Sequence, residues 1–271
     1  MAGAPSSCEA FDMADALRMH VLPSLQDPAL LLAFAGWNDA GEAASFAVRY
    51  VADALHAVPL AEIDPEEFYD FTVRRPVVSL DAAGARRLEW PRNEFRFASM
   101  DGRRDLVVGI GVEPHLRWGA YCDQIERLAD RTGVRRVVLL GAFLADVVYS
   151  RPVALTGFAS APDLLAKLDV PASTYQGPTG IVAAVADRLM ASGREVLSLW
   201  AGLPHYIGVA PNPRGALALL DRVRHALDLR IDEAPLRSEA AEFEERISAL
   251  VAADPEISEY VRQLKRREFA Q

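Results

Sequence analysis

Short apolar runs and stretches of helical periodicity follow one another along the chain. Residues 29–35 form an unbroken apolar run, which is too short to cross a bilayer and is typical of a strand buried on both faces of a sheet. In residues 43–55 the apolar positions recur at intervals of three and four, which predicts an amphipathic helix. A polar turn, 36–41, joins them. This order predicts the first half of a βαβ unit, and ligands commonly bind beyond the carboxyl end of such a strand.

The same alternation continues to about residue 231. Strands are expected at 59–63, 105–111, 136–140 and 195–201, with a brief one at 172–175. Helices with one apolar face are expected at 118–129, 181–189 and 216–227. Because strand and helix alternate, we predict an α/β fold in which helices sandwich a mainly parallel sheet.

Residues 71–99 depart from this pattern. Strand-like patches at 71–73, 77–80 and 87–97 follow one another without a helix between them. In the last patch, apolar residues alternate with charged ones, so one face is expected to meet water. An antiparallel excursion or a sheet edge is predicted here.

The chain is expected to end in a helical extension, 232–271, that follows a core domain of residues 15–231 and a loose tail of residues 1–14. In the extension, apolar residues recur at heptad-like intervals across two helices separated at Pro255. This seam either folds back on its own domain or contacts another subunit. Its interface candidates are Leu236, Phe243, Ile247, Leu250, Ile257, Val261 and Leu264.

Composition narrows the class of protein. A chain of 271 residues, half of them apolar, can bury a sizeable core, and its net charge of −9 argues against a nucleic-acid surface. The N-terminus does not resemble a signal peptide and no window suits a membrane span, so we predict a cytoplasmic protein that binds no membrane. The only cysteines, Cys8 and Cys122, cannot build a disulfide framework or a cysteine metal site, and Cys122 lies in an apolar helix stripe.

Polar side chains gather in four turns that follow predicted strands: 36–41, 111–115, 176–180 and 202–206. The first and third lead into helices, whose N-terminal N–H groups favour an anion. A phosphate, carboxylate or sugar ligand would suit these turns, but helix capping alone also explains residues such as Asp39, with Glu42 completing a capping box. The ligand-binding candidates are Asn38, Asp39, Glu113, Tyr175, Thr179, His205 and Tyr206.

The common catalytic signatures do not occur in the sequence. There is no phosphate-binding loop ending in Gly-Lys-Ser/Thr, no complete dinucleotide fingerprint, no Gly-x-Ser-x-Gly elbow and no His-Glu-x-x-His pair. We therefore assign no catalytic residue and expect neither a cofactor nor a metal.

Five motifs, however, resemble those of the proteasome assembly chaperone family, in its actinobacterial branch related to the second eukaryotic chaperone subunit. They are AGWNDAG at 35–41, GVEPHLRW at 111–118, VVLLGAF at 137–143, YQGPTGI at 175–181 and AGLPHY at 201–206, and the resemblance covers about residues 28–250.

This resemblance implies an α/β sandwich similar to the purine nucleoside phosphorylase fold. It also implies assembly into a small homo-oligomer such as a trimer, and protein binding rather than a known reaction. Relatives that engage the proteasome can use a C-terminal hydrophobic-Tyr-any motif, whereas this chain ends in residues 268–271, EFAQ, so another surface would have to contact such a client. The alternative is an enzyme or sensor that binds a nucleoside, sugar or phosphorylated metabolite at the strand exits.

Overall fold

The structure is a computed structural model that describes residues 16–100 and 104–269, so the predicted tail lies outside the described residues. The strands are β1 (Leu17–Met19), β2 (Ala29–Ala35), β3 (Val58–Ile63), β4 (Val77–Leu80), β5 (Arg86–Glu89), β6 (Asn93–Ala98), β7 (Leu106–Val112), β8 (Arg136–Ala145), β9 (Leu155–Ala159) and β10 (Glu195–Pro204). The helices are the 3-10 turn η1 (Ala40–Glu42), α1 (Ala43–Ala54), α2 (Trp118–Thr132), α3 (Pro162–Lys167), α4 (Ile181–Ala191), α5 (Pro213–Leu227), α6 (Ala234–Ala253) and α7 (Pro255–Phe269).

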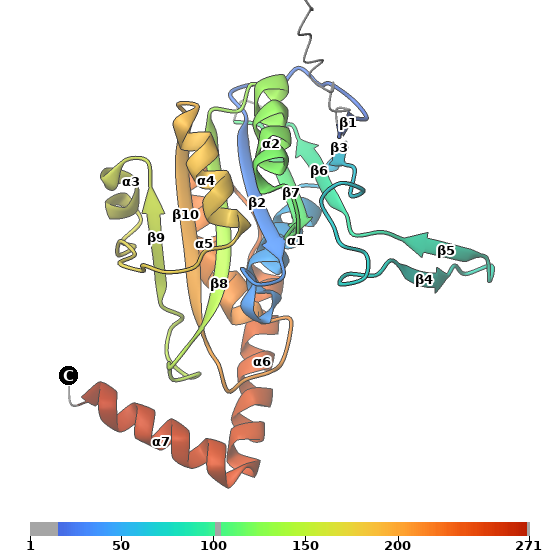
Figure 1. Cartoon of the computed structure of the whole chain (residues 1–271). Coiled ribbons are helices and arrows are strands. Elements are labelled where there is room, and N and C mark those ends of the chain that lie inside the picture. The colour runs from blue at the N-terminus through green and yellow to red at the C-terminus, as the bar shows by residue number, and fades with distance from the viewer. Residues whose placement is uncertain (1–15, 101–103, 270–271) are drawn as a thin grey trace, which may run out of the picture.

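An eight-stranded sheet in the order β1-β3-β6-β7-β2-β8-β10-β9 forms the centre of the molecule (Figure 1). Its four middle strands, β7, β2, β8 and β10, are parallel, and antiparallel strands flank them on both sides. The α/β prediction is confirmed, and the sheet is mixed with a parallel centre. The parallel strands all end at one edge, here called the strand-exit edge.

Strand β2 is buried on both faces, as its apolar run predicts. Ala29, Leu31 and Ala33 join a core formed with α1 and α5. Leu30, Leu32 and Phe34 point to the opposite core, formed with α2 and α4. Successive side chains of a strand alternate between faces, so a helix layer on each side requires an unbroken apolar run.

The predicted antiparallel excursion is present, with different boundaries. The patch 87–97 divides between β5 and β6, and β6 joins the main sheet antiparallel to β7. Strands β4 and β5 form a separate two-stranded sheet that projects from the body (Figure 1). Residues 71–73 form a turn, and the strand expected at 172–175 is reduced to a single bridge between Gly157 and Ala172.

The C-terminal seam packs mainly within the chain. Helix α6 packs beside α5 and continues beyond the strand-exit edge, where α7 turns away from it (Figure 1). The chain's own core buries five of the seven interface candidates, half-buries Ile257 and leaves Leu250 55% exposed. The buried five therefore cannot contact a second copy as the chain is folded. They are Leu236, Phe243, Ile247, Val261 and Leu264.

The heptad reading was wrong at one position. Val251, rather than Leu250, joins the small core of Val148, Phe243 and Ile247. A helix that lies against a globular body follows the 3.6-residue period, which drifts away from a strict heptad. Among the described residues, no helix has both the length and the apolar character needed to cross a membrane.

Candidate functional site

Asn38 and Glu113 meet where strands β2 and β7 end. Asn38 Nδ2 donates a hydrogen bond to Glu113 Oε1 over 2.8 Å, and the same oxygen accepts the backbone N–H of Ile181 over 2.9 Å. Ile181 is the first residue of α4. The carboxylate of Glu113 therefore occupies the helix N-terminus at which an anionic ligand was considered.

Asp39 has the same role at α1. Its Oδ1 accepts the N–H of Ala44 over 2.8 Å and that of Ser45 over 3.2 Å. The capping function expected for Asp39 is thus present, although the turn η1 intervenes and Asp39 is not the adjoining N-cap residue. Glu42 completes no capping box, because it has a left-handed φ of 52° and no capping side-chain bond.

Burial changes the acid–base behaviour of Asp39. It raises the pKa of the Asp39 carboxyl above its ordinary value, while hydrogen bonds from Ser45 and Ala44 oppose part of the rise. In the described part of the chain, Asp39 Oδ2 and Asn38 Oδ1 are buried without a hydrogen-bond partner. Burying such atoms destabilises a fold, and an ordered water is the simplest group to satisfy them.

A buried polar cluster fixes the backbone that leads into Glu113. Asn93 Oδ1 accepts the N–H of Val112 over 3.0 Å and the hydroxyl of Tyr121 over 2.8 Å. Asn93 Nδ2 donates to the Tyr69 hydroxyl over 2.6 Å, and that hydroxyl donates to the Val112 carbonyl. Burial raises the pKa of both tyrosines, so these hydroxyls stay protonated and remain donors.

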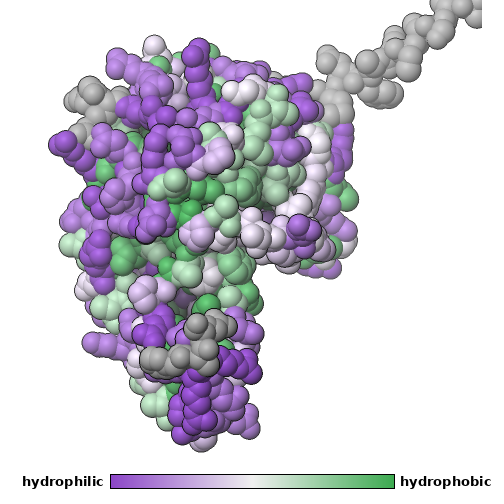
Figure 2. Space-filling model, turned by 90° about the vertical axis from the view of Figure 1, so that its left-hand side faces the viewer, coloured by the Kyte–Doolittle hydropathy of each residue, from purple (hydrophilic) through white to green (hydrophobic). Residues whose placement is uncertain are grey.

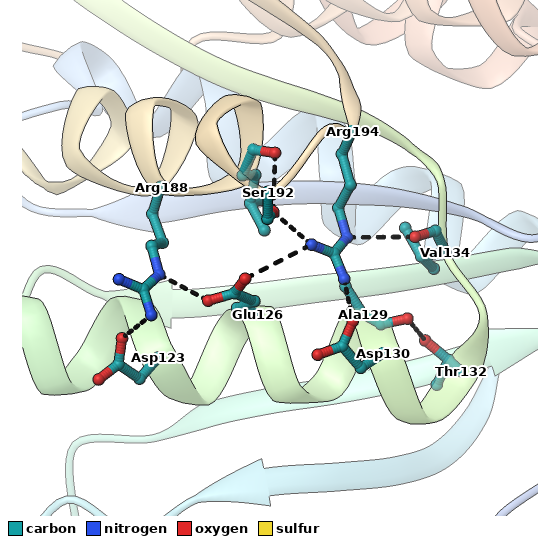
Figure 3. A network of polar contacts seen from close by, with 10 residues as sticks. Asp123, Glu126, Ala129, Asp130, Thr132, Val134, Arg188, Ser192 and Arg194 are labelled. Carbon is teal, nitrogen blue, oxygen red and sulfur yellow. Dashed lines mark hydrogen bonds and ion pairs between the residues drawn. The ribbon is translucent and has the colours of Figure 1, made fainter.

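Ion pairs fix α4 against α2, which is the other half of the support for this site (Figure 3). Arg188 pairs with Glu126 over 2.5 Å and with Asp123 over 2.6 Å. Arg194 pairs with Asp130. These contacts, together with the apolar core beneath them, hold the N-terminus of α4 in register with Glu113.

His205 and Tyr206 belong to a different cluster, at the end of β10. His205 Nε2 lies 3.0 Å from the Tyr260 hydroxyl of α7 and 3.1 Å from Asp146 Oδ1. The Tyr206 hydroxyl donates to the Val147 carbonyl over 2.9 Å. In the described part of the chain no hydrogen bond or ring contact joins this cluster to Asn38 or Glu113, so the predicted candidates form two groups.

Tyr175 and Thr179 lie on the exposed loop before α4. The Tyr175 hydroxyl donates to the Pro178 carbonyl over 2.9 Å, which closes the loop on itself. Gly180 lies directly against Asn38 and Glu113, since a Cβ built on it would meet Asn38 Oδ1 at 2.2 Å and Glu113 Oε1 at 2.6 Å. The third turn therefore meets the first two through glycine backbone.

A cavity of about 130 Å³ lies near the end of β10, between the 147–154 loop and α6. None of the seven ligand candidates lines it. Small-molecule sites usually measure about 300 Å³ or more. Among the described residues, no group of three or more His, Cys, Asp or Glu is arranged to hold a metal ion.

Large apolar side chains are exposed at the strand-exit edge, and sequence reasoning missed them. Trp37 is 63% exposed beside Asn38, Leu144 is 59% exposed near the end of β8, and Tyr175 is 66% exposed. Seen from the side of β9 and α3, hydrophobic residues also reach the surface between two hydrophilic ends of the molecule (Figure 2). A tryptophan inside a polar turn was the available signal for this surface, because turns rarely place large apolar side chains in water.

The chain resembles solved structures over nearly its whole length. A PAC2 family protein from Streptomyces avermitilis is 40% identical, with a TM-score of 0.80, covering 87% of this chain and 100% of that one. A proteasome-assembly chaperone homologue from Mycobacterium tuberculosis is 38% identical, with a TM-score of 0.78, covering 86% and 99%.

A more distant likeness concerns the fold alone. The archaeal proteasome activator PbaB from Pyrococcus furiosus is 18% identical, with a TM-score of 0.68, covering 86% of this chain and 97% of that one. A comparison with curated proteins gave no match. The model of the PAC2 family matches residues 33–251, which include all four strand-exit turns, and the chain therefore belongs to the PAC2 family.

Proposed function

We propose that this chain is a non-catalytic, self-associating protein that acts through protein–protein contacts, with proteasome subunits as its client. The client follows from the relative described as a proteasome-assembly chaperone homologue, which is 38% identical to this chain. The apolar strand-exit surface, defined by Trp37, Leu144 and Tyr175, is the proposed client contact.

One observation carries the proposal: at the strand-exit edge, polar groups bond within the chain and apolar groups face water. Glu113 and Asp39 occupy the N-termini of α4 and α1. His205 and Tyr206 bond to Tyr260 and to the chain's own backbone. A metabolite site needs convergent polar groups directed into a concavity, whereas an exposed aromatic and aliphatic surface suits a protein partner.

Affinity capture from a native lysate of the source organism tests the proposal. Mass spectrometry of proteins bound to the tagged full chain should show proteasome subunits enriched over a tag-only control. The double variant Trp37→Ser, Leu144→Ser should lose them. The control variant is Leu22→Ser, because Leu22 is also 63% exposed but lies in the connection that leads into the start of β2. The proposal fails if no proteasome subunit is enriched, or if the control variant loses binding equally.

The alternative, a nucleoside, sugar or phosphorylated metabolite at the same edge, rests on the buried Asn38 Oδ1 and Asp39 Oδ2 that have no partner in the described part of the chain. A thermal-shift screen against a metabolite panel separates it from the proposal. A ligand that stabilises the wild-type chain but not Asn38→Ala would favour the alternative.

A further inference from the structure

Strands β4 and β5 form a projecting arm, defined here as residues 74–89. Their register pairs Val78 with Leu88 and Leu80 with Arg86, which places these four side chains on one face. We call this the apolar face of the arm. The opposite face is polar, because the Ser79 hydroxyl donates to Glu89 over 2.6 Å.

The apolar face of the arm has no partner in the described part of the chain. Leu80 is 69% exposed, and Val78 and Leu88 are each about half exposed. An isolated two-stranded hairpin is at best marginally stable in water, and needs a third strand or a packed face. The sequence thus supplies an ordered hairpin with apolar side chains where no element of the same chain covers them, which is the signature of a contact surface.

Charge identifies what covers this face. The arm contains four arginines and two acidic residues, so its net charge is +2, while the whole chain carries −9. The rest of the molecule therefore carries −11. Two arms packed face to face would bring their arginines together, which is unfavourable. An arm against the acidic body of a second copy brings opposite charges together.

Helix α6 offers a surface of matching chemistry. Beyond the strand-exit edge its outer side carries the exposed acids Glu242 and Glu245, with Ala249 and the exposed Leu250 one to two turns further on. Small and apolar residues suit the flat face of a hairpin, and the acids suit an arginine. The arm leaves the body at the same edge, because β6, which follows it, is antiparallel to β7 and begins where β7 ends.

We propose that the apolar face of the arm binds the outer side of α6 in a second copy of this chain, with Arg86 facing Glu242 and Glu245. This inference rests on the self-association in the proposed function and names the surfaces that make it. Each copy presents one arm and one α6, so every contact of this kind can be repeated in a closed symmetric assembly.

Light scattering coupled to size-exclusion chromatography, at matched concentrations, tests the contact. Wild type should elute as an oligomer. Arg86→Glu and Leu80→Ser should shift the mass toward the monomer, with at least about tenfold weaker association, since one lost buried contact often has that effect. Arg87→Glu is the control because Arg87 lies on the opposite face, 3.5 Å from Asp81. Circular dichroism checks that every variant is folded.

A charge exchange tests the partner surface. Glu242→Arg with Glu245→Arg should weaken assembly by itself, and combining it with Arg86→Glu should restore the wild-type mass. Failure to restore it would overturn the α6 contact. An oligomer that withstands Arg86→Glu and Leu80→Ser, or an equal loss in Arg87→Glu, would overturn the arm contact and leave the proposed self-association standing. A monomeric wild type would overturn both.

Discussion

Asn38 donates to Glu113 over 2.8 Å, and this single contact joins the ends of strands β2 and β7. Asn38 is fully buried, and the same Glu113 oxygen also accepts the first N–H of α4. Two turns and one helix, separated by up to 143 positions between residues 38 and 181, are thereby fixed to one carboxylate oxygen. The strand-exit edge is held together from inside, and the apolar side chains above it are presented on a rigid base.

Removing that carboxylate should destabilise the fold. Glu113→Ala leaves the Asn38 amide and the Ile181 N–H without an acceptor, and each unsatisfied buried donor lowers the free energy of unfolding by about 1–3 kcal/mol. We expect a total loss of about 2–4 kcal/mol, measured by urea unfolding. Glu113→Gln keeps an oxygen at the same position and should lose less. The exposed Glu66→Ala is the control, with a change within about 0.5 kcal/mol. Equal stability of Glu113→Ala and Glu66→Ala would contradict this role.

The close approach of Gly180 to the same pair gives a second test. A methyl group at this position would overlap Asn38 Oδ1 and Glu113 Oε1, so Gly180→Ala must displace one of them. Overpacking of this kind typically lowers stability by about 1–3 kcal/mol. Gly119→Ala is the matched control, because a Cβ there meets nothing within 4 Å and alanine favours the first turn of α2. Thermal unfolding should separate the two variants, and a neutral Gly180→Ala would show that the turn relaxes freely.

Local periodicity predicted the parts of the fold that depend on local patterns. The run from Ala29 to Ala35 and the helix that follows it have the layers on both sides that their patterns require. Leu250 shows the limit, because a heptad and a 3.6-residue period differ by one position after about four turns and only the packed body decides between them.

The candidate site was less predictable than the fold. Glu113 and Ile181 lie 68 residues apart, and the pattern of neither segment indicates that a carboxylate from one turn caps a helix from another. His205 was grouped with the other turns because parallel strands end at one edge, yet its partner, Tyr260, belongs to α7. Such contacts depend on tertiary placement, which one sequence does not encode as a local pattern.

The raised pKa of Asp39 predicts a characteristic pH dependence. The folded chain binds this proton more tightly than the unfolded chain, whose ordinary value is 3.8. The resulting stabilisation is complete below 3.8 and is lost as the pH rises through the higher, folded-state pKa. Compared with Asp39→Asn, which keeps the capping oxygen but does not titrate, wild type should therefore lose stability as the pH rises through that window.

Urea unfolding at a series of pH values measures this difference. Asp163→Asn provides an opposite control, because the hydrogen bond from Lys167 lowers the pKa of Asp163. Its stabilisation is present above the ordinary pKa and is lost as the pH falls through the lowered one. A flat difference between wild type and Asp39→Asn across the acidic range would mean that Asp39 is hydrated in the folded chain.

The hydroxyl of Tyr260 should hold α7 against the body. It donates to Asp146 over 3.0 Å and meets His205 Nε2 at 3.0 Å, while its ring packs against Tyr206. Tyr260→Phe keeps the ring and removes both polar contacts, so the amides of α7 should exchange with deuterium faster while those of α1 and α2 stay unchanged. Tyr175→Phe is the control, because its hydroxyl contacts only its own loop, at Pro178. If α7 exchanges at the wild-type rate in Tyr260→Phe, the apolar core of Phe243, Ile247 and Leu264 is sufficient to hold the helix.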